Sequence, residues 1–578
     1  MEQFEQEFDV VVVGSGAGGL TAAWTAARAG LSVLVLEKAA VFGGNSAMSG
    51  GAAWMPGSPV LKREGYVDEP EDLFAYLQTI APDIDPERHR QYIAEIPRLH
   101  EALEQLPQFR DGFRTQIGYS DYHVDMGGSA RGRGVFPAPV DSAILGDELD
   151  HLRGATFAPP GIARKIWFVS RDLEDLSRLR WGFSPRRYLV FARLGMRLIH
   201  NLVTGKKKIT MGRALIARLR TAIKDLGVPL WLATPMKSLI MRDGAVVGVT
   251  AEKAGRLVSI GARKGVIMAS GGFEFSEEMR RTYQPILPEF GFSSGAESNT
   301  GDGIRAGEAV GAAIDLMDSA WWMPSIKAPH GPQPTVLERQ SPNQFMINRA
   351  GVRFANEAAP YSDFGRIHKE GLARGESHFP AFLITDHYAW THNMIGGHMP
   401  GSPIPPNWIE HGTLTIADSL EELATKIDVS ADALVATAER FNAFARNGRD
   451  LDFQRGENEY DHYYGDARLA NPNLAEVRQP PFYAIKIGLG DLGTNGGLLT
   501  NARAQVLDGH GAVIPGLYAT GNCSASIMGY RYAGPGGTIG PAMTFGWIAG
   551  NDVAGRHDVG TAQERAPSFD RSNSVVAG

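Results

Sequence analysis

Cysteine is nearly absent from the chain, in which Cys523 is the only one among 578 residues. A lone thiol excludes an internal disulfide, an iron–sulfur cluster held by cysteines and a cysteine-rich zinc site. No apolar run approaches the about 18 residues of a transmembrane helix, so we expect no membrane span. The acidic first residues, Met1–Glu7, lack the basic start and apolar stretch of a signal peptide. These absences together predict a cytoplasmic protein.

Neither sign of charge dominates the composition. The chain carries 57 Lys and Arg against 64 Asp and Glu, a net charge of −7, and 43% of its residues are hydrophobic. That balance is typical of a soluble globular protein and argues against nucleic-acid binding. The histidines show no pair with metal-ligand spacing, so we assign no metal. At this length we expect several domains.

A glycine-rich turn between two apolar segments stands near the start of the chain. Asp9–Val13 is a β-branched run typical of a strand buried on both faces of a parallel sheet. A helix over about 20–29 and a second strand over 31–36 follow it. We therefore predict a dinucleotide-binding βαβ unit, in which the turn lets the backbone approach a pyrophosphate and an acid binds the ribose. The residues expected to bind are Gly14, Ser15, Gly16, Ala17, Gly18, Gly19, Glu37 and Lys38.

Further turns of small residues occur far along the chain. One follows an apolar strand that ends at Met268, and others lie near the C-terminus. Turns so widely separated imply a long, extended ligand, which FAD fits better than NAD. The additional residues expected to bind it are Gly44, Asn45, Ser46, Ser49, Gly50, Gly51, Ala269, Asp302, Gly521, Asn522, Thr538 and Ile539.

Three motifs carry a resemblance to a known family: Trp54-Met55-Pro56-Gly57, Asp491–Thr494 followed by Gly496-Gly497, and Tyr532-Ala533-Gly534-Pro535-Gly536. The chain resembles flavoproteins related to succinate dehydrogenase and fumarate reductase, and most closely the 3-ketosteroid Δ1-dehydrogenases. The similarity covers about 8–135 and 210–555. It implies an α/β fold, a Rossmann-like FAD-binding domain with an inserted α+β catalytic domain. We expect the FAD-binding domain over 1–320 and 494–556, the catalytic domain over 321–493, and a loose tail over 557–578.

The resemblance also implies an activity, the FAD-dependent 1,2-desaturation of a 3-ketosteroid in steroid degradation. Tyr532 and the Gly536 N–H match the donors to the ketone oxygen, which would form an oxyanion hole. Tyr361 matches the base that takes the proton from carbon 2, Tyr122 matches its supporting tyrosine, and carbon 1 gives a hydride to flavin N5. A phenol with a pKa near 10 is a poor base at neutral pH. Tyr361 therefore needs a donor such as Tyr122 or a local positive potential.

This chain lacks residues that some related activities require. Dicarboxylate-reducing members have a histidine before the paired glycines, where this chain has Gly493-Thr494-Asn495. Members with covalent flavin carry a histidine where this chain has Asn45–Ser49, so we expect non-covalent FAD. The 3-ketosteroid Δ4-(5α)-dehydrogenases remain the nearest alternative because they also use a C-terminal tyrosine. A non-catalytic scaffold with this fold is a further alternative.

The family pattern breaks in a basic stretch over about 151–210. It holds thirteen Lys and Arg against three acidic residues, interleaved with apolar ones. On a helix, Phe191, Leu194, Leu198 and Leu202 would share one face, and Arg193, Arg197 and His200 another. Such a basic amphipathic helix predicts contact with an anionic membrane surface through about 164–208, at the inner face of the cell membrane, with a quinone as electron acceptor. The alternative is a surface segment that packs on the FAD-binding domain.

Overall fold

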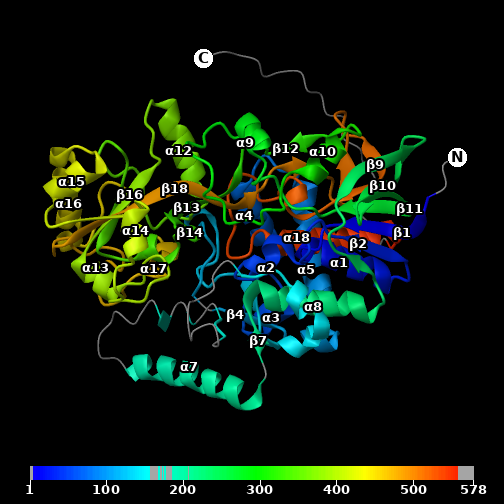
Figure 1. Ribbon diagram of the computed structural model, residues 1–578, viewed down its shortest axis with the longest axis horizontal. Coiled ribbons are helices and arrows are strands. Elements are labelled where there is room, and N and C mark those ends of the chain that lie inside the picture. Colours follow the sequence, from blue (N-terminus) through cyan, green and yellow to red (C-terminus); the bar gives the residue numbers. More distant parts are fainter. Residues whose placement is uncertain are drawn as a thin grey trace.

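The computed structural model describes residues 4–116, 118–155, 167–169, 172, 175–176, 185–205 and 207–556, with only the backbone described for 185–188. Two sheets lie side by side along the long axis of the molecule (Figure 1). One contains the N-terminal strands and is called the βαβ sheet below. The other contains strands between residues 320 and 494 and is called the antiparallel sheet.

The predicted βαβ unit is confirmed. β1 (Gln6–Val13) leads into α1 (Ala17–Arg28), which begins earlier than expected, and then into β2 (Val33–Leu36). β1 pairs in parallel with β2 and with β11 (Arg256–Met268). Val10, Val11 and Val12 are fully buried between these neighbours, as the β-branched run predicts.

The rest of the βαβ sheet comes from distant parts of the chain. Its path runs β20-β21-β11-β1-β2-β8, and β10 pairs with both β11 and β9. β21 joins from the C-terminal region and is parallel to β11. The added strands are β8 (Leu230–Trp231), β9 (Met236–Arg242), β10 (Ala245–Lys253), β20 (Gln505–Leu507) and β21 (Val513–Ala519).

α1 and the C-terminal helix α18 (Ile539–Val553) pack closely against each other because small residues face the contact. A Cβ added at Gly546 would lie 2.4 Å from the Gly18 carbonyl oxygen. Farther along the pair, Trp24 and Trp547 stack with their ring centroids 6.0 Å apart. The last helix therefore holds the turn before α1 in place. α8 (Met211–Asp225) also packs on α1.

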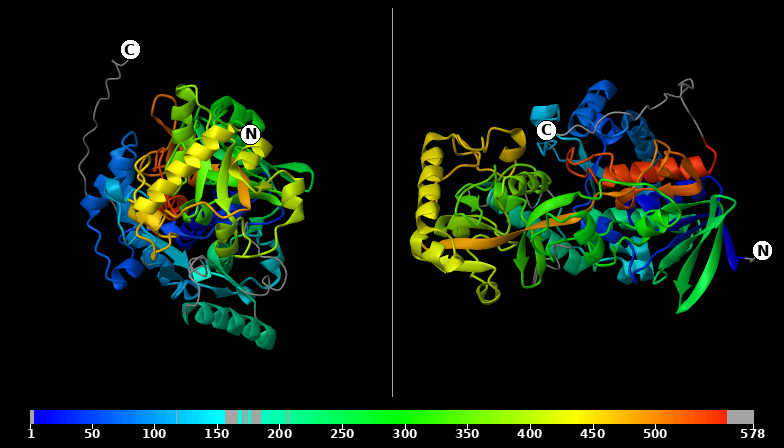
Figure 2. Two further views of the ribbon diagram at one scale, coloured as in Figure 1. Left: turned by 90° about the vertical axis from the view of Figure 1, so that its left-hand side faces the viewer. Right: turned by 90° about the horizontal axis from the view of Figure 1, so that it is seen from above.

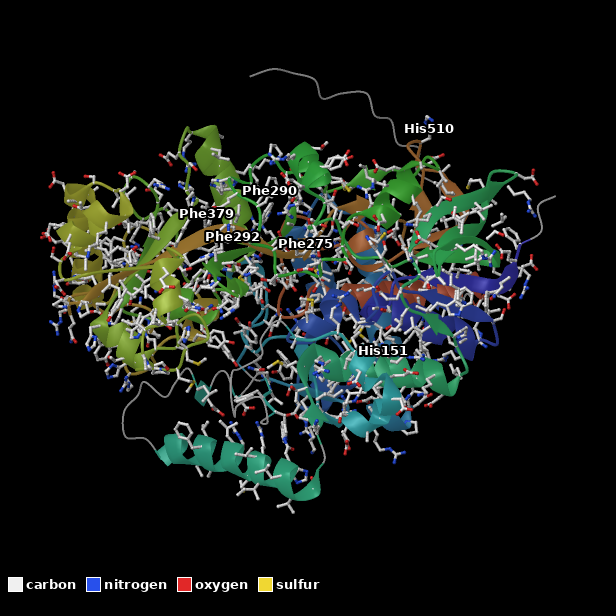
Figure 3. All side chains as sticks on the ribbon, in the orientation of Figure 1. His151, Phe275, Phe290, Phe292, Phe379 and His510 are labelled. Atoms are coloured by element: carbon white, nitrogen blue, oxygen red, sulfur yellow. The ribbon has the colours of Figure 1, made fainter. Side chains whose placement is uncertain are left out.

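The antiparallel sheet is built around β18 (Phe482–Thr494), which pairs with three other strands. Phe292, labelled in Figure 3, fills the space over Gly488, where an added Cβ would lie 2.4 Å from its ring. The end of β18 reaches toward the βαβ sheet (Figure 2). The other strands are β13 (Ala320–Ala328), β14 (Gly331–Pro334), β15 (Gln344–Ile347), β16 (Ala381–Asp386) and β17 (Leu414–Ala417).

Helices surround the antiparallel sheet, and further short elements connect the two sheets. The helices are α11 (Leu337–Gln340), α12 (Asp363–Ala373), α13 (His387–His392), α14 (Pro406–Glu410), α15 (Leu420–Ile427), α16 (Ala431–Asn447) and α17 (Glu459–His462). The connecting elements are α9 (Glu277–Tyr283), α10 (Asp302–Glu308), β12 (Ile314–Asp315) and β19 (Gly497–Leu498).

The segment after β2 forms a small helical unit beside the C-terminal turns. Tyr92 stacks on Trp54 and its hydroxyl donates to the Trp54 carbonyl oxygen. The backbone N–H of Tyr122 donates to the Ala533 carbonyl at 3.0 Å, so this unit fixes Tyr122 beside the C-terminal glycine turn. Its elements are α2 (Gly44–Met48), β3 (Ala53–Trp54), α3 (Pro59–Arg63), α4 (Pro70–Ile80), α5 (Pro86–Glu104), β4 (Phe113–Thr115), β5 (Gly134–Pro137), β6 (Val140–Asp141) and its partner β7 (Lys208–Ile209).

α7 (Pro185–Thr204) stands apart from the rest of the protein (Figures 1 and 2). The predicted helix is confirmed, but its faces differ from the prediction. Leu194 is buried, whereas Phe191 and Leu202 are exposed. Arg193 and Arg197 turn inward and pair with the buried Asp172. A helical projection groups residues by face but does not say which face turns inward.

The rest of the basic segment lies partly outside the described residues. Among the residues that the structure describes, no helix is long and apolar enough to cross a membrane. Within the same residues, no group of three or more His, Cys, Asp or Glu side chains is placed to hold a metal ion.

Candidate active site

A single cavity of about 1010 Å³ extends from the βαβ sheet to the antiparallel sheet. Every residue that the sequence singled out for cofactor binding or catalysis lines it. The residues of the βαβ unit form one end, which we call the nucleotide end. Side chains of the inserted segment, including Gln333, Glu338 and Trp408, form the other end, which we call the substrate end. A cavity between two structural units is a common location for a ligand site.

Glycines bring the backbone close together at the nucleotide end. Gly14 has φ of 110°, and a Cβ added there would lie 2.2 Å from the Ala269 carbonyl oxygen. A Cβ at Gly19 would lie 2.1 Å from the Gly14 carbonyl oxygen. The N-cap of α1, Gly16, makes no side-chain cap hydrogen bond. The turn therefore presents backbone N–H groups at the start of a helix, which is the arrangement that binds a pyrophosphate.

Two charged groups of the nucleotide end are already oriented by the protein. Glu37 is buried, and its carboxylate accepts hydrogen bonds from Ser15 Oγ at 2.5 Å and from the Ala39 N–H at 2.9 Å. Lys38 Nζ donates to Asp302 at 2.6 Å, so these two predicted residues form a pair.

Asn45 is held by two residues that the sequence interpretation missed. Its Nδ2 donates to Glu274 at 2.8 Å, and its Oδ1 accepts from Asn299 at 3.1 Å. Glu274 is buried, and this burial raises the pKa of its carboxyl group. No local motif marks Glu274, since the three residues meet only in the folded chain.

Three predicted tyrosines meet in the middle of the cavity. Tyr122 Oη donates to Tyr361 Oη at 2.9 Å, and their rings are in an edge-to-face contact. Tyr532 stacks on Tyr122 with a centroid distance of 5.2 Å, and its centroid lies 5.6 Å from that of Tyr361. All three are at most 5% exposed. Three hydroxyl groups from distant segments are thus brought to one place.

The Gly536 turn lies beside Tyr532. Gly536 has φ of 90°, and an added Cβ would lie 2.5 Å from the Ala52 backbone, so only glycine fits. Among the described residues its N–H has no hydrogen-bond acceptor, whereas its carbonyl accepts from Trp54 N–H at 3.0 Å. Tyr532 Oη lies 3.2 Å from Thr538 Oγ1. Gly536 and Tyr532 therefore offer two donors to an oxygen bound in the cavity.

Burial opposes ionisation of these tyrosines. It raises the pKa of Tyr122, Tyr361 and Tyr532 above the ordinary phenol value. The compensating positive charge comes from Arg339, which is 1% exposed and interacts electrostatically with Tyr361. Arg339 Nη1 donates to the carbonyl oxygens of Glu357 and Ala359, just before Tyr361. Arg339 is a further residue that the sequence interpretation missed.

The chain is similar to known flavoproteins along almost its whole length. The family model described as FAD binding domain matches residues 9–539. The 3-oxosteroid 1-dehydrogenase of Mycolicibacterium smegmatis is 43% identical over 566 residues, which are 95% of this chain and 97% of that protein. The chain belongs to the 3-ketosteroid Δ1-dehydrogenase family of FAD-binding flavoproteins.

Two further proteins are also similar to this chain. The 3-ketosteroid Δ1-dehydrogenase of Sterolibacterium denitrificans, solved in complex with 1,4-androstadiene-3,17-dione, has 37% identity and a TM-score of 0.87, over 95% of this chain and 100% of that one. The 4-oxocyclohexanecarboxylate 2-dehydrogenase of Sinomonas cyclohexanicum is 36% identical over 99% of this chain and 97% of that protein. The predicted fold class and FAD cofactor are confirmed. The domain boundaries and the role of each site residue stay predictions.

The nucleotide end fits the FAD of this family. The glycine turn leaves room for a pyrophosphate against the backbone, and Glu37, the acid that we expect to bind a ribose, lines the same end. Side chains that the sequence analysis did not single out, such as Thr234 and Met236, also line this end. Among the described residues, the histidines that line the cavity are His330 and His398, which both belong to the inserted segment.

Proposed function

We propose that the protein is an FAD-dependent 3-ketosteroid Δ1-dehydrogenase. The observation that carries the proposal is the hydrogen-bonded pair Tyr122–Tyr361 beside Tyr532 and the Gly536 N–H. Family membership supports the same activity. Bound FAD, held without a covalent bond, supplies the hydride acceptor for this chemistry.

Tyr532 and Gly536 polarise the ketone of the substrate. The Tyr532 hydroxyl and the Gly536 N–H donate to the 3-oxygen of the steroid and stabilise negative charge as it develops there. Because both donors are fixed in a buried site, they need no reorganisation during the reaction. A polarised ketone makes the proton on carbon 2 more acidic.

Tyr361 removes that proton. The hydrogen bond from Tyr122 Oη stabilises the ionised form of Tyr361, and the positive charge of Arg339 acts in the same direction. These two effects oppose the burial that raises the pKa of Tyr361. They supply the neighbouring donor and the positive potential that a phenol base requires.

The lining of the cavity disfavours carboxylate substrates. Among the described residues, Lys38 is the one Lys or Arg side chain that lines it, and Lys38 pairs with Asp302 at the nucleotide end. The substrate end thus offers no cationic clamp for a dicarboxylate or a cyclohexanone carboxylate. A neutral 3-ketosteroid fits this lining better than the substrate of a fumarate reductase.

The activity is tested by anaerobic mixing of the purified yellow protein with a panel of 3-ketosteroids. We expect bleaching of the flavin absorbance and a product with a new double bond between carbons 1 and 2, located by NMR and mass spectrometry. A new bond between carbons 4 and 5 would instead favour a Δ4-(5α)-dehydrogenase. A protein that binds FAD but is not bleached by any ketosteroid would be a scaffold.

The outward face of α7 supports a second proposal, contact with a membrane surface. Leu189 is 69% exposed, Met196 64% and Val203 79%. Phe191, Ile199 and Leu202 are also exposed, and α7 itself projects from the rest of the protein (Figure 1). An apolar face of this size on a projecting helix is suited to the boundary between lipid headgroups and acyl chains.

Charge has a smaller part in this contact than the sequence suggests. Arg193 and Arg197 are paired with Asp172 and Asp175, so the apolar residues would provide most of the binding and exposed cations such as Lys207 the rest. On the inward side, Val190 and Leu194 pack with Met394, which lines the substrate end. A steroid dissolved in the membrane would therefore lie close to the cavity. A quinone in the same membrane is the electron acceptor that we propose.

Vesicle sedimentation tests the membrane contact. We expect the protein to pellet with anionic phosphatidylglycerol vesicles. The triple variant Met196→Ser, Ile199→Ser, Val203→Ser should bind these vesicles more weakly by a factor of about ten or more. Val67→Ser is the matched control, because Val67 is 84% exposed on another part of the surface. Equal binding of the triple variant and the parent would exclude α7 as the contact. Reoxidation of the reduced enzyme by menaquinone vesicles tests the acceptor.

A further inference from the structure

The substrate end contains a buried carboxyl group that the proposed mechanism does not use. Glu338, on α11, is 4% exposed and lines the cavity. Its Oε1 accepts a hydrogen bond from the Gly396 N–H at 2.8 Å. Within the described residues, no Lys or Arg side chain forms an ion pair with it, because the adjacent Arg339 donates instead to backbone carbonyls. An unpaired buried carboxyl group calls for an explanation.

A second polar group lies next to Glu338. Gln333, on β14, also lines the cavity, and its Oε1 is buried without a hydrogen-bond partner among the described residues. The two side chains meet around Gly396. A Cβ added to Gly396 would lie 3.1 Å from Gln333 Oε1 and 2.1 Å from the Trp408 ring. Glycine at this position lets Trp408 form a flat wall beside the two polar groups.

The position of this pair relative to the tyrosines is set by β13. Trp321 contacts Tyr532 with a centroid distance of 5.0 Å, and Ile326 on the same strand pairs with Gln333. Five strand residues cover about 16 Å. Gln333 therefore lies beside the other end of β13 from Tyr532, on the side where the far rings of a steroid held at Tyr532 would lie. Met323 lines the cavity between the two ends.

The chemistry of the pair suits a neutral oxygen function. Burial raises the pKa of Glu338, so the carboxyl group retains its proton more readily than an exposed one. A neutral carboxylic acid has an O–H donor, and a glutamine amide has both an acceptor and donors. Together they can bind a ketone or a hydroxyl group. Opposite an alkyl side chain they would stay unpaired and desolvated, which is unfavourable.

We propose that Glu338 and Gln333 form a specificity site that binds an oxygen substituent on ring D, so that the protein selects 3-ketosteroids with a 17-oxo or 17-hydroxy group. This inference rests on the proposed function and adds to it the class of substrate. Glu338 and Gln333 position the far end of the steroid and take no part in the proton transfer. Substitution of either residue should therefore change KM and the dissociation constant of the steroid and leave kcat nearly unchanged.

The test compares androst-4-ene-3,17-dione with androst-4-en-3-one, which has the same rings and no oxygen at carbon 17. We expect the parent protein to prefer the dione by about tenfold or more in kcat/KM, as a site built for a hydrogen-bonding group does. Glu338→Met should remove most of this preference by raising KM for the dione, with kcat nearly unchanged. Glu338→Gln keeps a permanent donor and should retain the preference. Glu410→Met, at an exposed carboxylate on α14, is the matched control.

A binding measurement keeps the test independent of turnover. The dissociation constants of the two 1,4-dien-3-one products, followed by thermal shift or flavin absorbance, should show the same preference and the same loss in Glu338→Met. If that variant does not fold, Gln333→Met provides the second measurement. Two outcomes would overturn this inference and leave the proposed function intact. One is a parent protein with equal kcat/KM for both steroids, and the other is a Glu338→Met variant that keeps the parent's preference. Failure to desaturate either steroid would instead overturn the proposed function.

Discussion

The two ends of the cavity are built in different ways. The nucleotide end consists of backbone turns and small side chains, and its charged groups pair with one another, as in Lys38–Asp302. The substrate end consists of large side chains from separate segments, and its Gln333 Oε1 atom has no partner among the described residues. We infer that the first end provides binding and the second provides chemistry and selection. Substitutions at the second should change the reaction while FAD binding persists.

Tyr361→Phe should have the largest effect and separates the two ends most clearly. Loss of the base should lower kcat by about 10³-fold or more, within the range of general acid–base catalysis. The phenylalanine ring keeps the packing with Tyr122 and Tyr532, so the FAD content should equal that of the parent. Stopped-flow measurement of flavin reduction, with FAD content determined by absorbance, checks both expectations.

Tyr460→Phe is the matched control for this variant. Tyr460 is also buried and packs on Tyr122 with a centroid distance of 4.7 Å, yet its hydroxyl has no hydrogen-bond partner in the described part of the chain. Its kcat should stay within about twofold of the parent, because no contact to substrate is lost. Near-normal activity of Tyr361→Phe would assign the base to another residue.

Tyr532→Phe should have the next largest effect. It removes one of two donors to the ketone oxygen and should lower kcat by about 10²–10³-fold, as for one oxyanion-hole donor. The Gly536 N–H remains, which accounts for the residual rate. Tyr530→Phe, two positions away at a residue 45% exposed, should leave kcat unchanged. Equal rates for the two variants would contradict the oxyanion hole.

Arg339→Met should change the pH dependence rather than abolish activity. Burial raises the pKa of Tyr361, and the positive charge of Arg339 opposes that rise. Activity that needs the phenolate increases with pH, so removal of the charge should move the rising limb of kcat/KM to higher pH. A shift of the profile by about one pH unit would lower kcat/KM about tenfold at any given pH on that limb. The steady-state pH profile is the measurement.

A control is needed because Arg339 also holds the chain before Tyr361. Melting temperature and FAD content separate a loss of folding from a shifted profile. Arg374→Met, at an arginine whose side chain is 58% exposed in the same unit, should keep the parent profile. A variant of Arg339 that is less active at every pH with no shift would indicate a structural role alone.

The same contrast explains how much the sequence could predict. β1, α1 and the glycine turn are contiguous, so composition and spacing locate the βαβ unit, and resemblance supplies Tyr122, Tyr361 and Tyr532. Arg339 and Glu338 could not be predicted from the sequence, because the contacts that give them a role form only when distant segments fold together. A buried Arg beside a tyrosine and a carboxyl group opposite Gly396 have no signature in the local sequence.

α7 shows the other limit of the sequence. Its apolar and basic faces were visible as a pattern, but their orientation depends on Asp172, which lies in another segment. Asp172 is fully buried and attracts Arg193 and Arg197, so the basic face turns inward and the apolar face outward. Burial of paired charges and exposure of leucine is the reverse of what composition alone suggests.

Asp172→Asn should have the smallest effect on catalysis and tests whether α7 is independent of the cavity. The asparagine keeps the shape but removes the charge that Arg193 and Arg197 share, and Asp175 can still pair with Arg193. Because partners of a buried charge are destabilised when it is removed, we expect the amides of α7 to exchange about tenfold faster.

The tyrosines lie elsewhere, so kcat for a soluble ketosteroid should change by less than about twofold. The melting temperature should stay that of the parent, since within the described part of the chain α7 touches the body through few apolar contacts, chiefly Val190 and Leu194 with Leu176 and Met394. Met394 is the link to the substrate end, so a modest rise in KM alone would show that α7 supports that end of the cavity. A lower melting temperature together with a lower kcat would contradict the independence of α7, because it would join the helix to the cooperative core that holds the tyrosines.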